Sequence, residues 1–452
     1  MAETTPSPSL DAGNPTANVT FTFAEQATAS LALYGLSLLC IVWGGINSAS
    51  FVKRLIAKKR LVETSITISE ARKFPLTASI VLFSLYIFFK PDGKEWLLGF
   101  LSVHLPAHIS ERLNKTLLPG EGSTSLFQKL EAVTPENAKF LLEYIPTITK
   151  QHFMYFLLVF LCFEGCVSLA AILKPIYQRI LRLLPIGDRW PRKNTSYLLS
   201  LKKGKKEMDQ GDIEDATKRD VEYLMKIEVD SHDIIGILMC IPVGISHLYR
   251  RHWVTNNLLG VAFSIFGIEN LHLSSFKAGS LLLSGLFIYD IFWVFATDVM
   301  TSVAKGIDAP ILLQFPQDIF QNGWLEASKH SMLGLGDIVI PGIFIALLRR
   351  FDQRLGEKSG EKAKGPLKGR YYFATTIIAY MLGLFITMAV MHHFKRAQPA
   401  LLYLVPTCLL IPLVLAVIRG ELSELWNYDE EHLIEKDEDS KKKKVSDDKK
   451  KN

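Results

Sequence analysis

The sequence has few of the features that mark a disulfide-stabilised or soluble protein. It contains only five cysteines, and all of them lie inside apolar segments. The stretches between those segments have none, so no disulfide framework is expected. The chain also lacks a D-T/S-G sequence, an H-E-x-x-H sequence, a G-x-S-x-G sequence and a P-loop. The motifs of soluble aspartic proteases, zinc proteases, serine hydrolases and P-loop nucleotide-binding proteins are therefore missing.

Long apolar runs are present instead. Apolar residues make up 49% of the chain and the mean hydropathy is +0.20. They are concentrated in runs of about 18 or more residues that hold few charges, which is typical of membrane-spanning helices. The runs predict an all-α polytopic membrane protein with nine spans. We place the spans at about residues 29–52, 74–90, 152–173, 233–249, 256–273, 277–298, 331–348, 371–391 and 400–418.

The distribution of basic residues predicts the orientation of these spans. Residues 1–28 contain no lysine or arginine, so no cleavable signal peptide is expected, whereas "KRLIAKKR" (53–60) follows the first span. Basic loops mark the cytosolic side, so we predict a lumenal N-terminus and a cytosolic C-terminus. The segments that this topology assigns to the cytosol hold about three quarters of all lysine and arginine residues. No folded basic domain accompanies them, so no nucleic-acid partner is expected.

Three N-glycosylation sequons begin at Asn18, Asn114 and Asn194. The predicted topology puts Asn114 in a lumenal loop, Asn18 in the lumenal tail near the membrane, and Asn194 in the cytosol. Asn114 and Asn18 are therefore the candidate glycosylation sites, and Asn194 should carry no sugar.

The C-terminal tail is charged and low in complexity from about residue 427, which is typical of a disordered segment. It ends in "KKKN", so Lys449 and Lys450 are the fourth and third residues from the end. This ending resembles the dilysine signal by which coat machinery returns membrane proteins to the endoplasmic reticulum. A lysine-rich tail without that role would have the same ending.

Two aspartates stand deep inside apolar spans. Asp290 lies in "LFIYDIFWVF" (286–295), and Asp337 lies in "MLGLGDIVIPGIFIALL" (332–348). A carboxylate at bilayer depth costs several kcal/mol unless it has a partner, so such residues normally have a function. The other acids in spans, Glu164, Glu269 and Asp298, are isolated or near span ends.

The pair of aspartates is compatible with several functions. Two carboxylates a few ångströms apart share one proton, so one can take a proton from water while the other polarises a peptide carbonyl. The same pair could instead serve as a proton or cation site in a transporter, or as protonated residues that join helices. A non-catalytic quality-control subunit that binds membrane helices is a further alternative.

Three short sequences in ordered spans resemble the signature motifs of the intramembrane aspartyl proteases. These are "YD" at 289–290, "GLGD" at 334–337 and "QPALLYLVP" at 398–406. Within that group the chain resembles signal peptide peptidase more than presenilin, because presenilins have the opposite orientation and a longer loop between the sixth and seventh spans. The fifth span departs from the family pattern at Phe266 and Asn270.

The resemblance implies a presenilin-like fold, an aspartic endopeptidase activity without a cofactor or metal, and activity without accessory subunits. It also implies a division of the chain. The parts are a lumenal tail (1–28), five spans (29–273) with lumenal loop 91–151 and cytosolic loop 174–232, a catalytic region of four spans (274–420) and a cytosolic tail (421–452).

The resemblance further assigns roles to individual residues. Asp290 and Asp337 would be the catalytic dyad. The site would be shaped by Tyr289, Gly334, Leu335 and Gly336, and substrate would contact Pro399, Ala400 and Leu401. We expect Pro399 to begin the ninth helix, where its missing N–H costs nothing. The implied substrates are spanning peptides with a cytosolic N-terminus, chiefly signal peptides left by signal peptidase, in the endoplasmic reticulum. Membrane lipid, the coat machinery and a second copy of the chain are the other candidate partners.

Overall fold

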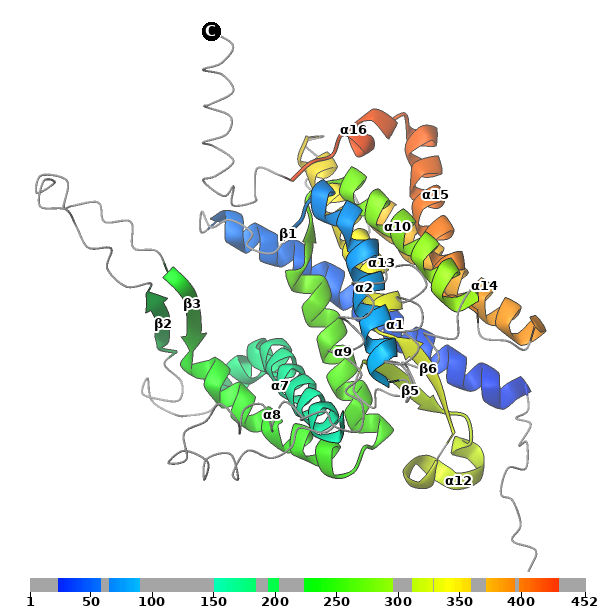
Figure 1. Ribbon diagram of the computed structural model, residues 1–452. Coiled ribbons are helices and arrows are strands. Elements are labelled where there is room, and N and C mark those ends of the chain that lie inside the picture. Colours follow the sequence, from blue (N-terminus) through cyan, green and yellow to red (C-terminus); the bar gives the residue numbers. More distant parts are fainter. Residues whose placement is uncertain are drawn as a thin grey trace, which may run out of the picture.

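The computed structural model describes residues 23–57, 65–89, 150–183, 194–202, 223–295, 311–327, 329–358, 371–394 and 398–430. Most of these residues are helical (Figure 1). The helices are α1 (Phe23–Ala57), α2 (Ile68–Phe89), α7 (Lys150–Leu183), α8 (Ser231–Tyr249), α9 (Trp253–Asn270), α10 (Phe276–Phe295), α12 (Ile319–Glu326), α13 (Gly336–Lys358), α14 (Tyr371–Phe394), α15 (Leu401–Arg419) and α16 (Leu422–Trp426).

A helix lies over each of the nine predicted spans. Six of them, α1, α7, α8, α10, α14 and α15, are long and apolar enough to cross a membrane. The all-α polytopic class is therefore confirmed, while crossing by α2, α9 and α13 stays a prediction. Large apolar side chains such as Ile288, Ile378 and Val414 are exposed on the outer faces of the helices, as is expected where a helix faces lipid rather than water.

The helices are arranged around α1, which packs against α9, α13 and α14. On one side the α7–α8 pair is joined to this centre mainly through α9, and on the other α10 packs between α2 and α15 (Figure 1). Close packing of α7 and α8 needs a small residue: a Cβ on Gly244 would lie 2.7 Å from Cys166 Sγ. All five cysteines are buried and free, so the expectation of no disulfide holds for them.

Three two-stranded sheets were not predicted from the sequence. They pair β1 (Ser65–Ile66) with β4 (His272–Leu273), β2 (Ser196–Lys202) with β3 (Tyr223–Asp230), and β5 (Leu312–Pro316) with β6 (His330–Gly334). The β1–β4 pair is parallel and the other two are antiparallel. The β5–β6 hairpin and α12 lie at the opposite end of the bundle from α16 (Figure 1).

Two sequence-based boundaries are wrong. The seventh span was expected to be helical from about residue 331, but residues 330–334 form β6 and the helix begins at Gly336. The tail was expected to be disordered from about residue 427, but Tyr428 and Glu430 are buried. The Glu430 N–H donates to the Ser274 carbonyl at 2.7 Å, which joins the chain there to the α9–α10 connection. Apolar periodicity cannot reveal such pairing with a distant segment.

Asn194 has a structural role at the start of α8. Its side-chain N–H donates to Asp230 at 3.1 Å, and its oxygen accepts from the Ser231 hydroxyl at 3.2 Å. A sugar would replace one of the two amide hydrogens, and the absence of a sugar at Asn194 stays a prediction. Asn18, Asn114, Lys449 and Lys450 lie outside the described residues.

Candidate active site

Asp290 is buried within the apolar helix α10, with 4% of its surface exposed. Its Oδ2 accepts a hydrogen bond of 3.1 Å from the Leu401 backbone N–H. Leu401 is the first residue of α15, so this N–H would otherwise be one of the unpaired donors at a helix start. The positive end of the α15 dipole therefore faces a carboxylate in the middle of a hydrophobic helix.

Asp337 stands in the first turn of α13. The helix begins here because the Leu335 carbonyl accepts from the N–H groups of Ile338 (3.1 Å) and Val339 (2.8 Å). A carboxylate in a first helical turn is favoured by the helix dipole. Because residues 330–334 are extended, Asp337 lies at a junction between strand and helix instead of inside a continuous spanning helix.

The two aspartates are brought together by the packing of α10 against α13. The charges of their carboxyl groups interact. Asp337 is partly exposed beside Gly336, which is exposed. Within the described part of the chain, Asp290 accepts one hydrogen bond and the Asp337 carboxyl group accepts none. The pair therefore keeps most of its hydrogen-bonding capacity for a further molecule.

The glycines of "GLGD" differ in their surroundings. A Cβ on Gly334 would lie 3.3 Å from Asp337 Oδ2, so a side chain there would crowd the carboxyl group. A Cβ on Gly336 would meet nothing within 4 Å. Leu335 packs against α9, because a Cβ on Gly260 would lie 3.5 Å from the Leu335 side chain. Gly334 and Leu335 thus fix the strand–helix junction beside Asp337.

The other expected site residues lie around this junction. Tyr289 packs against Trp293, with ring centroids 6.4 Å apart, and Trp293 in turn packs against apolar side chains of α2. Pro399 was expected at the first position of the ninth helix, but it lies two residues earlier, since α15 begins at Leu401 after the cap residue Ala400. The Pro399 carbonyl accepts from the Leu402 N–H at 3.3 Å. The structure thus places Leu401 next to Asp290 through the Leu401 N–H, and Pro399 is buried two residues earlier.

Comparison with known proteins decides the family. The family model described as "Signal peptide peptidase" matches residues 58–432 of the chain. The chain belongs to the signal peptide peptidase family. It is 58% identical to "Intramembrane protease 2" of Caenorhabditis elegans, over 95% of this chain and 96% of that protein. It is 34% identical to "Signal peptide peptidase" of Homo sapiens, over 93% of this chain and 89% of that protein. No solved structure matches the chain significantly.

Membership of the signal peptide peptidase family makes the chain a multi-pass membrane protein and an intramembrane protease. The resemblance inferred from "YD", "GLGD" and "QPALLYLVP" is thereby confirmed. In the described part of the chain, no group of three or more His, Cys, Asp or Glu side chains is arranged to hold a metal ion.

Sequence reasoning missed a tyrosine that holds Asp337 in this signal peptide peptidase family member. Pro341 stands four residues after Asp337 and has no N–H, so the Asp337 carbonyl lacks its normal helical donor. The hydroxyl of Tyr380 on α14, which is fully buried, donates to this carbonyl at 3.2 Å. The spacing of Asp337 and Pro341 signals an unpaired carbonyl, but nothing in the sequence identifies Tyr380 as its donor.

Two asparagines on α9 were also missed. Asn256 donates to the Leu312 carbonyl at 2.6 Å. Asn257 donates to the Gln314 carbonyl at 2.6 Å and accepts from the Gln314 N–H at 2.8 Å. Both asparagines are buried, and together they satisfy the edge of β5 that faces α9. Two adjacent amides in a predicted span were a signal that polar backbone would lie beside it.

Within the described residues, no third strand pairs with the hairpin, and the outer edge of β6 lies opposite the edge that faces β5. The Leu335 N–H donates to Ile311 at 3.1 Å and the Gln317 N–H donates to Lys329 at 2.8 Å, so odd-numbered residues of the two strands face each other. Even-numbered residues of β5 face α9. Even-numbered residues of β6, including Met332 and Gly334, therefore direct their backbone groups away from β5. This outer edge of β6 runs directly to Asp337.

Proposed function

We propose that the protein is an aspartic endopeptidase in which Asp290 and Asp337 form the catalytic dyad. The observation that carries the proposal is the convergence of these two carboxyl groups from α10 and α13, where the Leu401 N–H is the one donor that the described residues give to the pair. One carboxylate takes a proton from water, and the water attacks the peptide carbonyl that the protonated partner polarises. The Leu401 N–H orients Asp290 for this exchange.

The flanking residues have supporting roles in this proposal. Gly334 leaves space for the Asp337 carboxyl group, and Leu335 and Gly336 set the turn from β6 into α13. Tyr289 supports Trp293, which packs against α2, while Pro399, Ala400 and Leu401 form the wall on the α15 side. No cofactor or metal takes part.

The substrate binds as an extended strand on the outer edge of β6. A spanning helix keeps its amides in internal hydrogen bonds, so the chain must unwind before a peptide bond can be cut. Unwound backbone inside a membrane needs new partners. Strand addition to the free backbone groups of Met332 and Gly334 supplies them and leads the substrate to Asp337.

The substrates are spanning segments with a cytosolic N-terminus, chiefly signal peptides that remain after signal peptidase cleavage in the endoplasmic reticulum. The name of the human relative, "Signal peptide peptidase", supports this class. The lumenal N-terminus, the glycosylation of Asn114 and Asn18, and retrieval through Lys449 and Lys450 belong to the same proposal. Strong helix formers in a substrate span should slow cleavage, because they oppose unwinding.

The dyad is tested by cleavage of a signal-peptide substrate with purified protein in detergent. Asp290→Asn and Asp337→Asn should each lower the rate by at least about 10³-fold while thermal unfolding stays near the wild-type value. Glu164→Gln, which neutralises an acid on α7, is the matched control and should cleave normally. Cleavage that survives in either aspartate variant would remove that residue from the mechanism. Acid-dependent ion flux without hydrolysis would favour a transporter instead.

The β6 edge is tested at Met332, whose side chain is 58% exposed. Met332→Pro removes the outward N–H, so cleavage should fall at least about tenfold. Met332→Ala keeps the N–H and should cleave at nearly the wild-type rate. Equal loss in both variants would assign the effect to the side chain, and no loss in either would exclude strand addition at this edge.

A further inference from the structure

A pocket of about 360 Å³ lies among four helices and is separate from the aspartate pair. It is lined by the end of α1, the later part of α7, the first turn of α8 and the last turn of α9. The charge pattern of the sequence assigns all four of these helix ends to the cytosolic side. Its volume falls within the roughly 300–1,000 Å³ of sites that hold a small molecule. The pocket therefore opens at the depth of the phospholipid headgroups.

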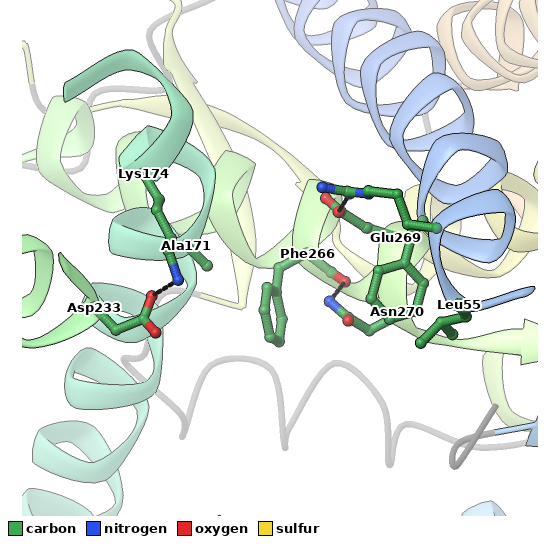
Figure 2. A pocket seen from close by; sticks show the side chains of 9 residues that line it. Leu55, Ala171, Lys174, Asp233, Phe266, Glu269 and Asn270 are labelled. Atoms are coloured by element: carbon green, nitrogen blue, oxygen red, sulfur yellow. Dashed lines mark hydrogen bonds and ion pairs between the residues drawn. The ribbon is translucent and has the colours of Figure 1, made fainter. Parts of the chain in front are cut away.

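Two groups of charged side chains face each other across this pocket (Figure 2). On the α7–α8 side, Lys174 Nζ lies 2.6 Å from Asp233 and 3.0 Å from Asp230. On the α1–α9 side, Glu269 lies 3.5 Å from Arg54 and accepts a hydrogen bond of 3.1 Å from Asn47. The two sides together hold two cations and three carboxylates.

The two cations are held differently. Lys174 is bound by two carboxylates and its side chain is 24% exposed. Among the described residues, Arg54 makes one ion pair, at 3.5 Å, which is longer than a good hydrogen bond, and 66% of its side chain is exposed. The guanidinium of Arg54 is therefore the group that can turn to an anion, and doing so would leave Glu269 with a carboxylate oxygen to satisfy.

Aromatic side chains separate the charged groups. Phe51 and Phe266 line the pocket, and Phe266 stands between the two sides in Figure 2. The Asn270 side chain donates to the Phe266 carbonyl at 2.9 Å. Phe266 and Asn270 are the two positions at which the fifth span departs from the family pattern, and both line this pocket.

We propose that the pocket binds the headgroup of an ethanolamine phospholipid. Arg54 turns to the phosphate of the ligand. The primary ammonium of the ligand then replaces Arg54 as the partner of Glu269, so each charge of the ligand meets an opposite charge. Phe51 and Phe266 contact the glycerol region. Choline cannot donate hydrogen bonds to Glu269, and serine adds a carboxylate to a site that already has more carboxylates than cations.

Occupation of the pocket should stabilise the bundle. The α7–α8 pair reaches the centre mainly through α9, and a headgroup held by Arg54 and Glu269 would fill the space between this pair and α1. A ligand that binds only the folded state raises the temperature of unfolding. Binding can therefore be measured without any reference to proteolysis.

The test uses the full chain, purified and delipidated in detergent. Native mass spectrometry and thermal unfolding are recorded with dioleoyl phosphatidylethanolamine, phosphatidylcholine, phosphatidylserine or water-soluble glycerophosphoethanolamine. The ethanolamine lipid should bind about tenfold more tightly than the other two lipids, because charge-assisted bonds to the ammonium are lost in them or opposed. Glycerophosphoethanolamine should bind more weakly than the lipid.

Two variants test the contacts to the phosphate and to the ammonium of the headgroup separately. Arg54→Gln should lower the affinity for all three lipids about tenfold. Glu269→Gln should abolish the preference for the ethanolamine lipid over the choline lipid. Lys53→Gln, which removes the neighbouring cation on α1 without touching the pocket, should change neither. The lipid-free unfolding temperature of each variant shows whether it is folded.

Four results would overturn the proposal. They are equal binding of the ethanolamine and choline lipids, unchanged binding by folded Arg54→Gln, an ethanolamine preference that survives in folded Glu269→Gln, and a soluble headgroup that binds as tightly as the lipid. The last result would assign the pocket to a soluble phosphate ester.

Discussion

Two groups of carboxyl groups lie at different parts of the bundle and differ in their hydrogen bonding. At the C-terminal clasp, formed by Arg350, Asp352 and Glu430, Arg350 Nε donates to both Glu430 oxygens at 3.0 Å. Asp352 accepts from two backbone N–H groups at the start of α14, at 3.1 and 2.8 Å. In the described part of the chain, Asp290 accepts one hydrogen bond and the Asp337 carboxyl group accepts none.

The difference separates the acids that hold the chain together from the two acids that we propose to be catalytic. A buried carboxylate whose two oxygens both accept hydrogen bonds from the protein fixes the chain and has less capacity for another molecule. A carboxyl group with few donors is destabilising unless water or a substrate binds it, and such groups cluster at functional sites. The number of donors, rather than burial alone, distinguishes Asp290 and Asp337 from Asp352 and Glu430.

The largest expected effect is on the free energy of unfolding. It is measured by neutralising one acid of the C-terminal clasp and one acid of the aspartate pair and comparing the two variants. Glu430→Gln leaves the Arg350 charge buried without a counter-charge and should lower the free energy of unfolding by about 3–5 kcal/mol. Asp337→Asn removes no hydrogen bond between described residues and should leave the unfolding temperature near that of the wild type. Thermal unfolding in detergent measures both. A greater loss of stability in Asp337→Asn than in Glu430→Gln would contradict the distinction.

An intermediate effect is expected at Tyr380 of α14, whose hydroxyl donates a hydrogen bond to the Asp337 carbonyl. Tyr380→Phe leaves the buried Asp337 carbonyl unpaired and should cost about 1–3 kcal/mol of unfolding free energy. Adding Pro341→Ala restores a helical N–H four residues after Asp337, so the double variant should recover at least half of the loss. Tyr403→Phe on α15 is the matched control, with little expected change. A double variant no more stable than Tyr380→Phe would show that the carbonyl is not the cause.

The smallest effect is expected at Asp230, a structural acid outside the membrane spans. A hydrogen bond from Ser196, with others from Lys174 and Asn194, holds the pKa of Asp230 at about 2. The ordinary pKa of an aspartate is about 3.9. The stabilisation by the folded-state anion is therefore complete above about pH 5 and is lost as the pH falls through the folded pKa.

This pH dependence can be measured as a difference between two proteins. Because 28% of the Asp230 side chain is exposed, its contribution should stay below about 1 kcal/mol. The unfolding temperature of the wild type should exceed that of Asp230→Asn by a constant amount from pH 5 to 7, and the gap should close below about pH 4. A gap that widens on acidification would contradict the assignment.

Much of the fold could be predicted because bilayer partitioning depends on local composition. The nine apolar runs all coincide with helices, and the chemistry of Asp290 and Asp337 was suggested by their depth in those runs. The β5–β6 hairpin could not be predicted, because "HSMLG" (330–334) continues into an apolar run. Its pairing with residues 312–316 also depends on contacts between segments that are separated in the sequence. The Asn256 and Asn257 contacts and the folded segment around Tyr428 and Glu430 were missed for the same reason.

The sequence by itself determined which segments are apolar, where the family motifs stand and which acids lie among apolar neighbours. Tertiary structure alone decided which donor each acid receives. Asp290 is bonded to Leu401, 111 residues further along the chain, and Glu430 is bonded to Arg350, 80 residues before it. Partitioning into a membrane is a property of a short segment, whereas a hydrogen bond requires two atoms at about 3 Å. Only the packing of distant helices brings atoms that close.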